Sequence, residues 1–288
     1  MKLKVLVIGC GRMGWANKSS TYNKRIKNIL PLAHCESVIS IKNLELVGVV
    51  DSSEKQAKLS GNDYSVEYFT DLEKALKKLS PDIVCIATRT PPRLEIVSKC
   101  LDYGIKNFHI EKPLCRSSAE LKLLQNMFID KKAIVSIGTI RRFSGIYKIA
   151  KAIVYSGKFG DIEKVTVAFG NAPALWSHSH CFDIANFFAN DEEIKSIKSF
   201  YEKGLNDFQI SNIDIDPIHI FSEIKYKKFS IYITPDEGFD VNIYCQEAMV
   251  TVNSDGEKLT IKNKENGYYS DPADYKFSDK EKYILKKY

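Results

Sequence analysis

The stretch that decides the fold stands near the start of the chain and reads LKVLVIGCGRMG, residues 3–14. A short apolar run of strand type leads directly into three glycines spaced as Gly-x-Gly-x-x-Gly. Gly9 allows a tight turn, Gly11 lets a pyrophosphate approach the backbone, and Gly14 allows close packing of the helix that follows. Backbone N–H groups at the start of that helix favour an anion. The stretch predicts a dinucleotide site formed by Gly9, Cys10, Gly11, Arg12, Met13 and Gly14.

A second predicted contact to the same dinucleotide is Asp51, at the end of the next apolar run. A carboxylate there accepts both ribose hydroxyls of the adenosine half and repels a 2′-phosphate, so Asp51, followed by Ser52, favours NAD over NADP. The alternative is a turn-forming aspartate. Asp51 lies 37 residues beyond Gly14 (51 − 14), where the motif usually has about 20. We therefore expect an insertion within residues 15–30, either a lid over the cofactor or a longer helix and loop.

The first half of the chain alternates apolar runs with stretches of helical periodicity. Strands that are apolar throughout and separated by helices indicate a parallel sheet covered on both faces. The expected strands are 3–9, 44–50, 82–87, 106–110 and 133–137, and the expected helices are 72–79, 92–103 and 119–129.

The second half changes character, because strands follow one another almost without helices. This pattern indicates a mainly antiparallel open sheet in an α+β domain. After a helix near 147–156, the expected strands are 164–169, 194–201, 218–226, 229–234, 239–244 and 248–252. We predict an α/β fold with a doubly wound Rossmann domain over residues 1–116, and an α+β domain for substrate binding and oligomerisation over residues 117–288.

Composition limits the classes of protein and partner. The net charge is +6, but the 42 basic residues are scattered and balanced by 36 acidic ones, which disfavours nucleic acid as a partner. Seven cysteines stand mostly in apolar runs without a C-x-x-C pair, as free thiols do in a reducing compartment. No apolar run reaches the ~20 residues that span a bilayer. We expect a cytoplasmic protein without a membrane partner.

Four segments in the same order along the chain carry a resemblance to a known family. Besides the glycine turn, they are Ile86–Pro91, Glu111–Pro113, Arg141–Phe143 and His180–Asp183. In this order they resemble the glucose–fructose oxidoreductase / inositol dehydrogenase / MocA (Gfo/Idh/MocA) family, over nearly the whole chain. The resemblance implies hydride transfer between NAD and a sugar, cyclitol or sugar phosphate, free or nucleotide-linked. It also implies that Thr88 and Arg89 lie at the nicotinamide ribose.

The same resemblance assigns catalytic roles. Lys112 would hydrogen-bond the reacting hydroxyl, and Glu111 would hold the nicotinamide end or orient the lysine. The position of Lys112 in the sequence is consistent with this role. A lysine at the end of a parallel strand can share in proton transfer once burial and cationic neighbours lower its pKa. His180 is the expected partner acid or base, since histidine titrates near neutral pH. Asp183, three residues later on a helix, would orient it.

One position departs from the family pattern. Trp176 stands where many dehydrogenases of the family have aspartate, four residues before the histidine, which removes a carboxylate from the proton relay. The alternative to an enzyme is therefore an NAD-binding sensor or scaffold on the same fold. The expected substrate-binding residues are Arg141, Arg142, Trp176 and His178, with Arg93 as a weaker candidate. We expect no metal, because alternation along a strand explains the acidic stretch 214–219, and we expect a homodimer or homotetramer.

Overall fold

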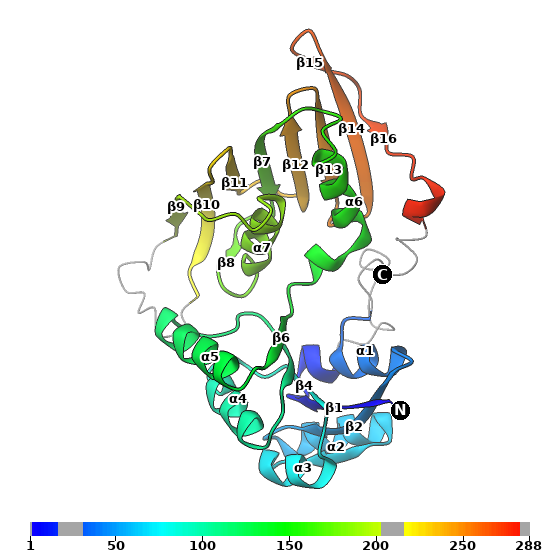
Figure 1. Cartoon of the computed structure of the whole chain (residues 1–288), viewed down its shortest axis with the longest axis vertical. Coiled ribbons are helices and arrows are strands. Elements are labelled where there is room, and N and C mark those ends of the chain that lie inside the picture. Colours follow the sequence, from blue (N-terminus) through cyan, green and yellow to red (C-terminus); the bar gives the residue numbers. More distant parts are fainter. Residues whose placement is uncertain (1, 17–30, 203–215, 283–288) are drawn as a thin grey trace. The chain divides into compact units, whose positions relative to one another are not determined.

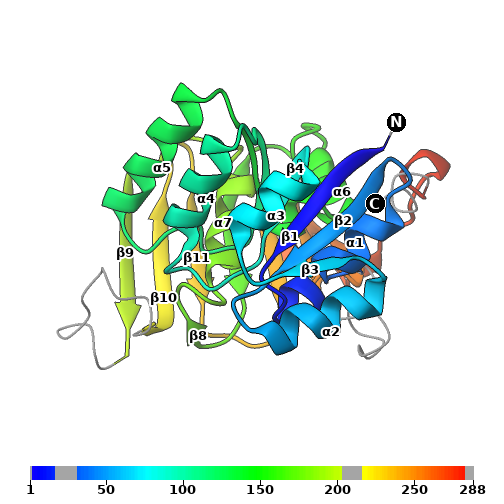
Figure 2. The ribbon, with the colours of Figure 1, turned by 90° about the horizontal axis from the view of Figure 1, so that it is seen from below.

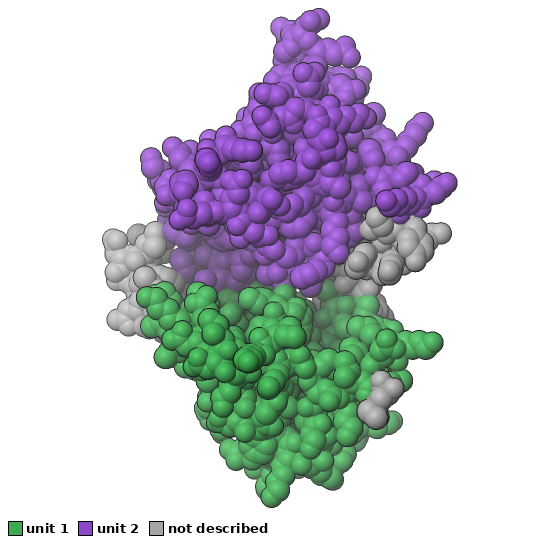
Figure 3. All heavy atoms as spheres, in the orientation of Figure 1, with its two compact units in different colours: residues 1–138, 210–213 green, residues 139–209, 214–288 purple. Residues whose placement is uncertain are grey.

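The computed structural model describes residues 2–16, 31–202 and 216–282. These residues divide into two compact units, shown in different colours in Figure 3. Unit 1 comprises residues 1–138 with 210–213, and unit 2 comprises residues 139–209 with 214–288. The predicted insertion lies almost entirely outside the described residues, as do Asp214 and Ile215 of the acidic stretch.

Unit 1 is built on a six-stranded parallel sheet with the strand order β3-β2-β1-β4-β5-β6 (Figures 1 and 2). This is the doubly wound Rossmann order, so the predicted fold class is confirmed. The strands are β1 Leu3–Ile8, β2 Leu44–Val50, β3 Glu67–Phe69, β4 Ile83–Ile86, β5 Asn107–Ile110 and β6 Ile134–Ile137. Five of them were predicted to within two residues at each end, and β3 was not predicted.

Helices connect these strands. They are η1 Arg12–Ala16, α1 His34–Ser40, α2 Glu54–Tyr64, α3 Leu72–Leu79, α4 Arg93–Asp102 and α5 Ser118–Asp130. The side chains of Ser53, Asp71 and Ser117 accept hydrogen bonds from the first backbone N–H groups of α2, α3 and α5, as N-caps do. The sequence reading missed α1 and α2, because α1 is short and α2 is largely polar.

Both faces of the unit 1 sheet are buried. Along β1, Leu6 and Ile8 belong to one apolar cluster, while Val5 and Val7 belong to a second cluster. Because successive side chains of a strand point to opposite faces, these two clusters lie on opposite sides of the sheet. This explains why β1 reads as a continuous apolar run rather than an alternating one.

The boundary between the units lies after Gly138, later than the predicted break at 116/117. The helix α5 and the strand β6 form the last α/β repeat of the Rossmann sheet, in which β6 pairs with β5 in parallel. The predicted break cut this repeat away from the sheet to which it belongs.

Unit 2 contains a ten-stranded mixed sheet. Its strands are β7 Ile162–Ala168, β8 Ala172–Pro173, β9 Ser196–Tyr201, β10 Ile218–Lys225, β11 Ser230–Thr234, β12 Asp240–Cys245, β13 Ala248–Asn253, β14 Lys258–Glu265, β15 Tyr268–Tyr269 and β16 Ala273–Asp274. Its helices are η4 Ile140–Phe143, α6 Gly145–Val154 and α7 Ser179–Phe188. The strand pairs are antiparallel except β7 with β11, which confirms the mainly antiparallel sheet. The strands β8, β14, β15 and β16 were not predicted.

The core of unit 2 lies between one face of this sheet and the helices α6 and α7 (Figure 1). The burial pattern of β12 explains why only one face of the sheet packs against the helices. Val241, Ile243 and Cys245 are buried, while the residues between them are only partly buried. Alternation of this kind is typical of a sheet that packs on one face. Among the described residues, no helix is long and apolar enough to cross a membrane.

Candidate NAD site and catalytic residues

The glycine turn after β1 has the geometry that its sequence predicts. Gly9 has a φ of +96°, and a Cβ there would lie 2.7 Å from the backbone nitrogen of Thr88. A Cβ on Gly14 would lie 1.7 Å from the carbonyl oxygen of Gly9. Both positions therefore exclude every other residue. The described part of the helix that follows is one π-helical turn, Arg12–Ala16.

Gly11 differs from the other two glycines. A Cβ there would meet no heavy atom of the described residues within 4 Å, and the residue is exposed. Gly11 is therefore not required by packing within the described chain, and its bare backbone faces open space. A pyrophosphate that lies against backbone N–H groups needs this kind of space. The residues present therefore fit a dinucleotide.

Asp51 connects the end of β2 to the glycine turn. One carboxylate oxygen accepts a hydrogen bond from the backbone N–H of Cys10 at 2.7 Å, and the other accepts one from that of Ser53 at 2.8 Å. Each carboxylate oxygen can accept about two hydrogen bonds. These contacts therefore fix the carboxylate and leave lone pairs for the two ribose hydroxyls. Ser52 beside it is exposed.

The predicted nicotinamide residues follow the ends of two neighbouring strands. Thr88 and Arg89 come after β4, and Glu111 and Lys112 come directly after β5. β1, β4 and β5 are adjacent and parallel, so their carboxyl ends meet the glycine turn at one edge of the sheet, where such sheets bind ligands. Lys112 is half-buried and Arg89 is exposed.

Arg93 has a role that the sequence did not predict. The residue is 3% exposed, and its guanidinium donates hydrogen bonds to the backbone carbonyl oxygens of Thr88, Glu111 and Pro113. Burial lowers the pKa of this arginine to about 10. The two carbonyls at Glu111 and Pro113 flank Lys112, so Arg93 fixes the backbone on both sides of the lysine. This differs from the substrate contact for which Arg93 was a weaker candidate.

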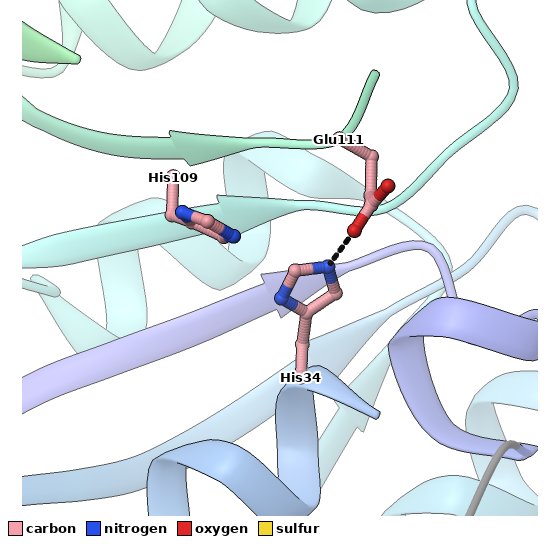
Figure 4. Close-up of side chains that lie close together, drawn as sticks. All are labelled: His34, His109 and Glu111. Carbon is pink, nitrogen blue, oxygen red and sulfur yellow. Dashed lines mark hydrogen bonds and ion pairs between the residues drawn. The ribbon is translucent and has the colours of Figure 1, made fainter. Parts of the chain in front are cut away.

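Glu111 is held from a second direction by His34, whose Nε2 lies 3.1 Å from a carboxylate oxygen of Glu111 (Figure 4). Glu111 is 5% exposed. Burial raises the pKa of its carboxyl, but the hydrogen bond and charge of His34 and the charge of Lys112 outweigh it, so the net pKa is lowered. No local pattern marks His34, which lies far from Glu111 along the chain.

In unit 2 the predicted arginines are engaged by carboxylates of the chain. Arg141 makes a two-pronged ion pair with Asp255, with both N–O distances 2.6 Å. The Nε of Arg142 lies 2.8 and 3.0 Å from the two carboxylate oxygens of Asp183. Burial raises the pKa of Asp183, although Arg142 opposes this shift. These pairs occupy the groups that were predicted to bind an anionic substrate and to orient a histidine.

The predicted histidines stand at the start of α7. His180 is the second residue of the helix and half-buried, and His178 is its N-cap and 1% exposed. The Nδ1 of His178 lies 2.7 Å from the Nδ1 of His219, whose Nε2 lies 2.6 Å from the hydroxyl of Ser222. The sequence did not predict His219. His178 is thus part of a buried polar chain, although it was predicted to bind substrate.

Trp176 precedes this helix and is 54% exposed. The backbone N–H groups of Leu175 and Trp176 both donate to the carboxylate of Asp216, each at 2.8 Å. Asp216 belongs to the acidic stretch that the sequence reading attributed to alternation along a strand. In the described part of this stretch, Ile218 and His219 begin β10, whereas Asp216 lies just before the strand and holds the backbone of the tryptophan loop.

Comparison with known proteins finds similar oxidoreductases. Residues 3–139 match the profile of an oxidoreductase family with an NAD-binding Rossmann fold, Gfo/Idh/MocA. The chain is 26% identical to the scyllo-inositol 2-dehydrogenase (NAD(+)) of Bacillus subtilis over 229 residues, 75% of this chain and 62% of that protein. It is also 26% identical to the uncharacterized oxidoreductase YhhX of Escherichia coli over 57% of this chain and 44% of that protein. The aligned stretch thus spans less than two thirds of either relative.

Solved structures share the fold of both units. A dehydrogenase (MviM) from Clostridium difficile has a TM-score of 0.68 at 20% identity, over 96% of this chain and 84% of that one. The WlbA dehydrogenase from Bordetella pertussis, in complex with NADH and UDP-GlcNAcA, has a TM-score of 0.68 at 15% identity, over 88% of this chain and 78% of that one. Residues 3–139 thus form a Rossmann domain that matches the Gfo/Idh/MocA oxidoreductase family.

Proposed function

We propose that the protein is an NAD-dependent dehydrogenase or reductase acting on a hydroxyl-bearing or keto carbon of a sugar, cyclitol or sugar phosphate, free or nucleotide-linked. The observation that carries the proposal is the position of Lys112. It is the second residue after β5, on the sheet edge that also holds the glycine turn and Asp51. Parallel sheets bind dinucleotides at this edge.

NAD is the cofactor in this proposal, and NADP is disfavoured. The carboxylate of Asp51 is fixed by two backbone N–H groups. A carboxylate held in this way accepts ribose hydroxyls and repels a 2′-phosphate. When bound, the nicotinamide supplies the site that accepts or gives the hydride; the residues of the chain bind it and manage the proton.

Lys112 is the proposed catalytic residue that hydrogen-bonds the reacting oxygen and shares its proton. Arg93 and His34 act as positioning residues, because they fix the backbone and the carboxylate that flank the lysine. His180 is the proposed second acid or base, since histidine exchanges protons near neutral pH. Trp176 is the proposed sugar-stacking side chain, because its indole is exposed and aromatic faces bind polyol rings through their apolar side.

The names of similar proteins support the substrate class. One relative is a scyllo-inositol dehydrogenase, and solved structures of similar fold include levoglucosan dehydrogenase with NADH and levoglucosan. The proposal also includes a cytoplasmic location and a homo-oligomer. The seven free cysteines, six of them buried, support the first, since a reducing compartment keeps such thiols free.

The second candidate is an NAD-binding sensor without turnover. Two observations favour it: Trp176 replaces the usual aspartate, and Asp183 is paired with Arg142. Each removes a carboxylate from a proton relay that includes His180.

The experiment that separates the two incubates the protein with NAD and a panel of cyclitols, sugars and sugar phosphates and follows the absorbance of reduced nicotinamide. We expect turnover that disappears in Lys112→Met while NAD affinity, measured by calorimetry, is retained. Lys106→Met, an exposed lysine just before the start of the same strand, is the matched control and should leave turnover unchanged. Turnover undiminished in Lys112→Met would contradict the assignment. NAD binding without turnover on any substrate of the panel would favour the sensor.

A further inference from the structure

Two histidines and a glutamate converge inside unit 1 (Figure 4). His34 is the first residue of α1, His109 lies in β5, and Glu111 directly follows β5. His34 and Glu111 are 6% and 5% exposed, and His109 is partly buried. Each side chain offers one nitrogen or oxygen such that all three atoms lie within 4.8 Å of one another.

The strand β5 explains why two of the three side chains lie together. His109 and Glu111 are two residues apart, and side chains at i and i+2 on a strand share one face. His34 reaches this face from α1, and its ring centroid lies 5.0 Å from that of His109. The three groups are therefore set by two different elements of the fold rather than by one flexible loop.

Hydrogen bonds outside the cluster orient its members. The Nδ1 of His109 lies 3.2 Å from the hydroxyl of Ser136 on the neighbouring strand β6. In the tautomer whose Nδ1–H donates to that hydroxyl, the Nε2 lone pair of His109 is left for a ligand. Metal-binding histidines are commonly held through their other ring nitrogen in this way.

Gly138 packs against the third ligand group, the carboxylate of Glu111. A Cβ at this position would lie 2.9 Å from a carboxylate oxygen of Glu111 and 3.2 Å from the other. The carboxylate of Glu111 therefore lies directly over the backbone of Gly138. Any larger residue at position 138 would occupy the space that the carboxylate fills. Packing from Gly138, directly after β6, thus holds the Glu111 carboxylate beside the two rings.

We propose that His34, His109 and Glu111 form a binding site for one divalent transition-metal ion of the zinc class. Two imidazole nitrogens and one carboxylate oxygen are a ligand set that Zn²⁺ prefers, and they are softer than the oxygen sets of Mg²⁺ or Ca²⁺. Ligand atoms about 2.1 Å from a tetrahedral zinc ion lie about 3.4 Å apart. The three atoms lie within 4.8 Å of one another, so the widest pair has to close by at most about 1.4 Å, which rotation of a side chain can supply.

Such an ion would attach α1 to the end of β5, one residue before Lys112. It would take the place of the proton between His34 and Glu111 and hold the same two groups together. The proposal departs from the expectation of no metal, which considered only the acidic stretch 214–219. It does not depend on the proposed function, because metal binding is measured here without NAD or substrate.

The test uses the full chain, stripped of metal by a chelator and then titrated with Zn²⁺ by calorimetry and with Co²⁺ by visible absorption. We expect one ion per chain and a Co²⁺ spectrum of nitrogen and oxygen ligands, without the intense sulfur-to-cobalt charge-transfer band that Cys35 or another thiol would give. Zn²⁺ should also raise the melting temperature.

Three variants and a matched control sharpen this test. His109→Leu should weaken Zn²⁺ binding by about 100-fold or more, since even loss of an outer partner costs about 10–100-fold. This variant leaves the pair of His34 and Glu111 intact, which favours folding. Ser136→Ala, at an exposed position, should cost about tenfold, and Glu111→Gln should also weaken binding. His219→Leu in unit 2 is the control and should bind Zn²⁺ like the wild type.

Two results would overturn the proposal. One is wild-type protein that does not bind either ion saturably at one equivalent per chain. The cluster would then be only the hydrogen-bonded pair of His34 and Glu111 with the ring of His109 beside it. The other is Zn²⁺ binding that is equally tight in folded His109→Leu, as judged by circular dichroism. Absence of dehydrogenase activity would bear on the proposed function alone.

Discussion

The carboxylate of Asp51 accepts a 2.7 Å hydrogen bond from the backbone N–H of Cys10, so the acid at the end of β2 also supports the glycine turn after β1. We predict that Asp51→Ala weakens NAD far more than NADP, because it removes both a ribose acceptor and a group that repels a 2′-phosphate. The loss of two backbone hydrogen bonds should also lower the free energy of unfolding by about 1–3 kcal/mol. Calorimetric titration with both cofactors measures the first effect and urea unfolding the second. Equal weakening of both cofactors would contradict the assignment.

Gly11 and Gly14 make a matched pair of positions. A Cβ on Gly11 enters open space, whereas one on Gly14 meets the carbonyl oxygen of Gly9 at 1.7 Å. We predict that Gly11→Ala folds with the stability of the wild type but binds NAD at least about tenfold more weakly, a loss of about 1.4 kcal/mol. Gly14→Ala should lower the unfolding free energy by about 1–3 kcal/mol or more, as overpacking does. Thermal unfolding and NAD titration of both variants check this. Unchanged NAD affinity in Gly11→Ala would place the pyrophosphate elsewhere.

Arg93 donates to three backbone carbonyls with one planar guanidinium. A lysine has a single ammonium and cannot reach all three. We predict that Arg93→Lys leaves buried carbonyls without donors and costs roughly 2–4 kcal/mol of stability. If the protein turns over a substrate, kcat should fall more than KM rises, because the backbone on both sides of Lys112 is loosened. A variant with wild-type stability and kcat would show that the three hydrogen bonds do not position this lysine.

The buried pair of His178 and His219 predicts sensitivity to acid. Burial, and then the neighbouring His178, lower the pKa of His219 to about 4. In the unfolded chain a histidine takes up a proton near pH 6.5, whereas folded His219 stays neutral down to about pH 4. The folded state therefore loses stability as the pH falls from about 6.5 to 4, by roughly 2–3 kcal/mol from this group.

Urea unfolding at a series of pH values measures this loss. The chain has two tryptophans, Trp15 in unit 1 and Trp176 in unit 2, so the fluorescence of a Trp15→Phe background reports unit 2. His219→Gln should flatten the pH dependence in this window, since glutamine does not titrate. An equally steep slope in that variant would assign the acid sensitivity to other groups.

Much of unit 1 could be predicted because its signals are local. The apolar run of β1, the glycines after it and Asp51 each lie within one short segment, and their roles follow from backbone geometry. Six of the strands of unit 2 were also predicted, since alternation in β12 and its neighbours is visible over a few residues. The helix α2 was missed because its sequence is too polar to show an apolar face.

The contacts of the site could not be predicted in the same way. His34 meets Glu111, and Asp183 meets Arg142, across 77 and 41 residues of sequence. No local pattern marks such partners, because they are brought together by the order of strands and helices. Arg93 is the clearest case: its charge indicated an exposed binding residue, whereas its three carbonyl partners exist only once β4 and β5 lie side by side.

The position of β7 in its sheet has a consequence for synthesis of the protein. This strand lies between β11 and β12, which the ribosome makes more than 60 residues later. All strands of the unit 1 sheet, by contrast, precede residue 138. The nascent Rossmann sheet can therefore assemble as it emerges, whereas residues 162–168 wait with an apolar face uncovered. We therefore expect this interval of translation to expose the chain to aggregation, as transiently uncovered apolar surface does.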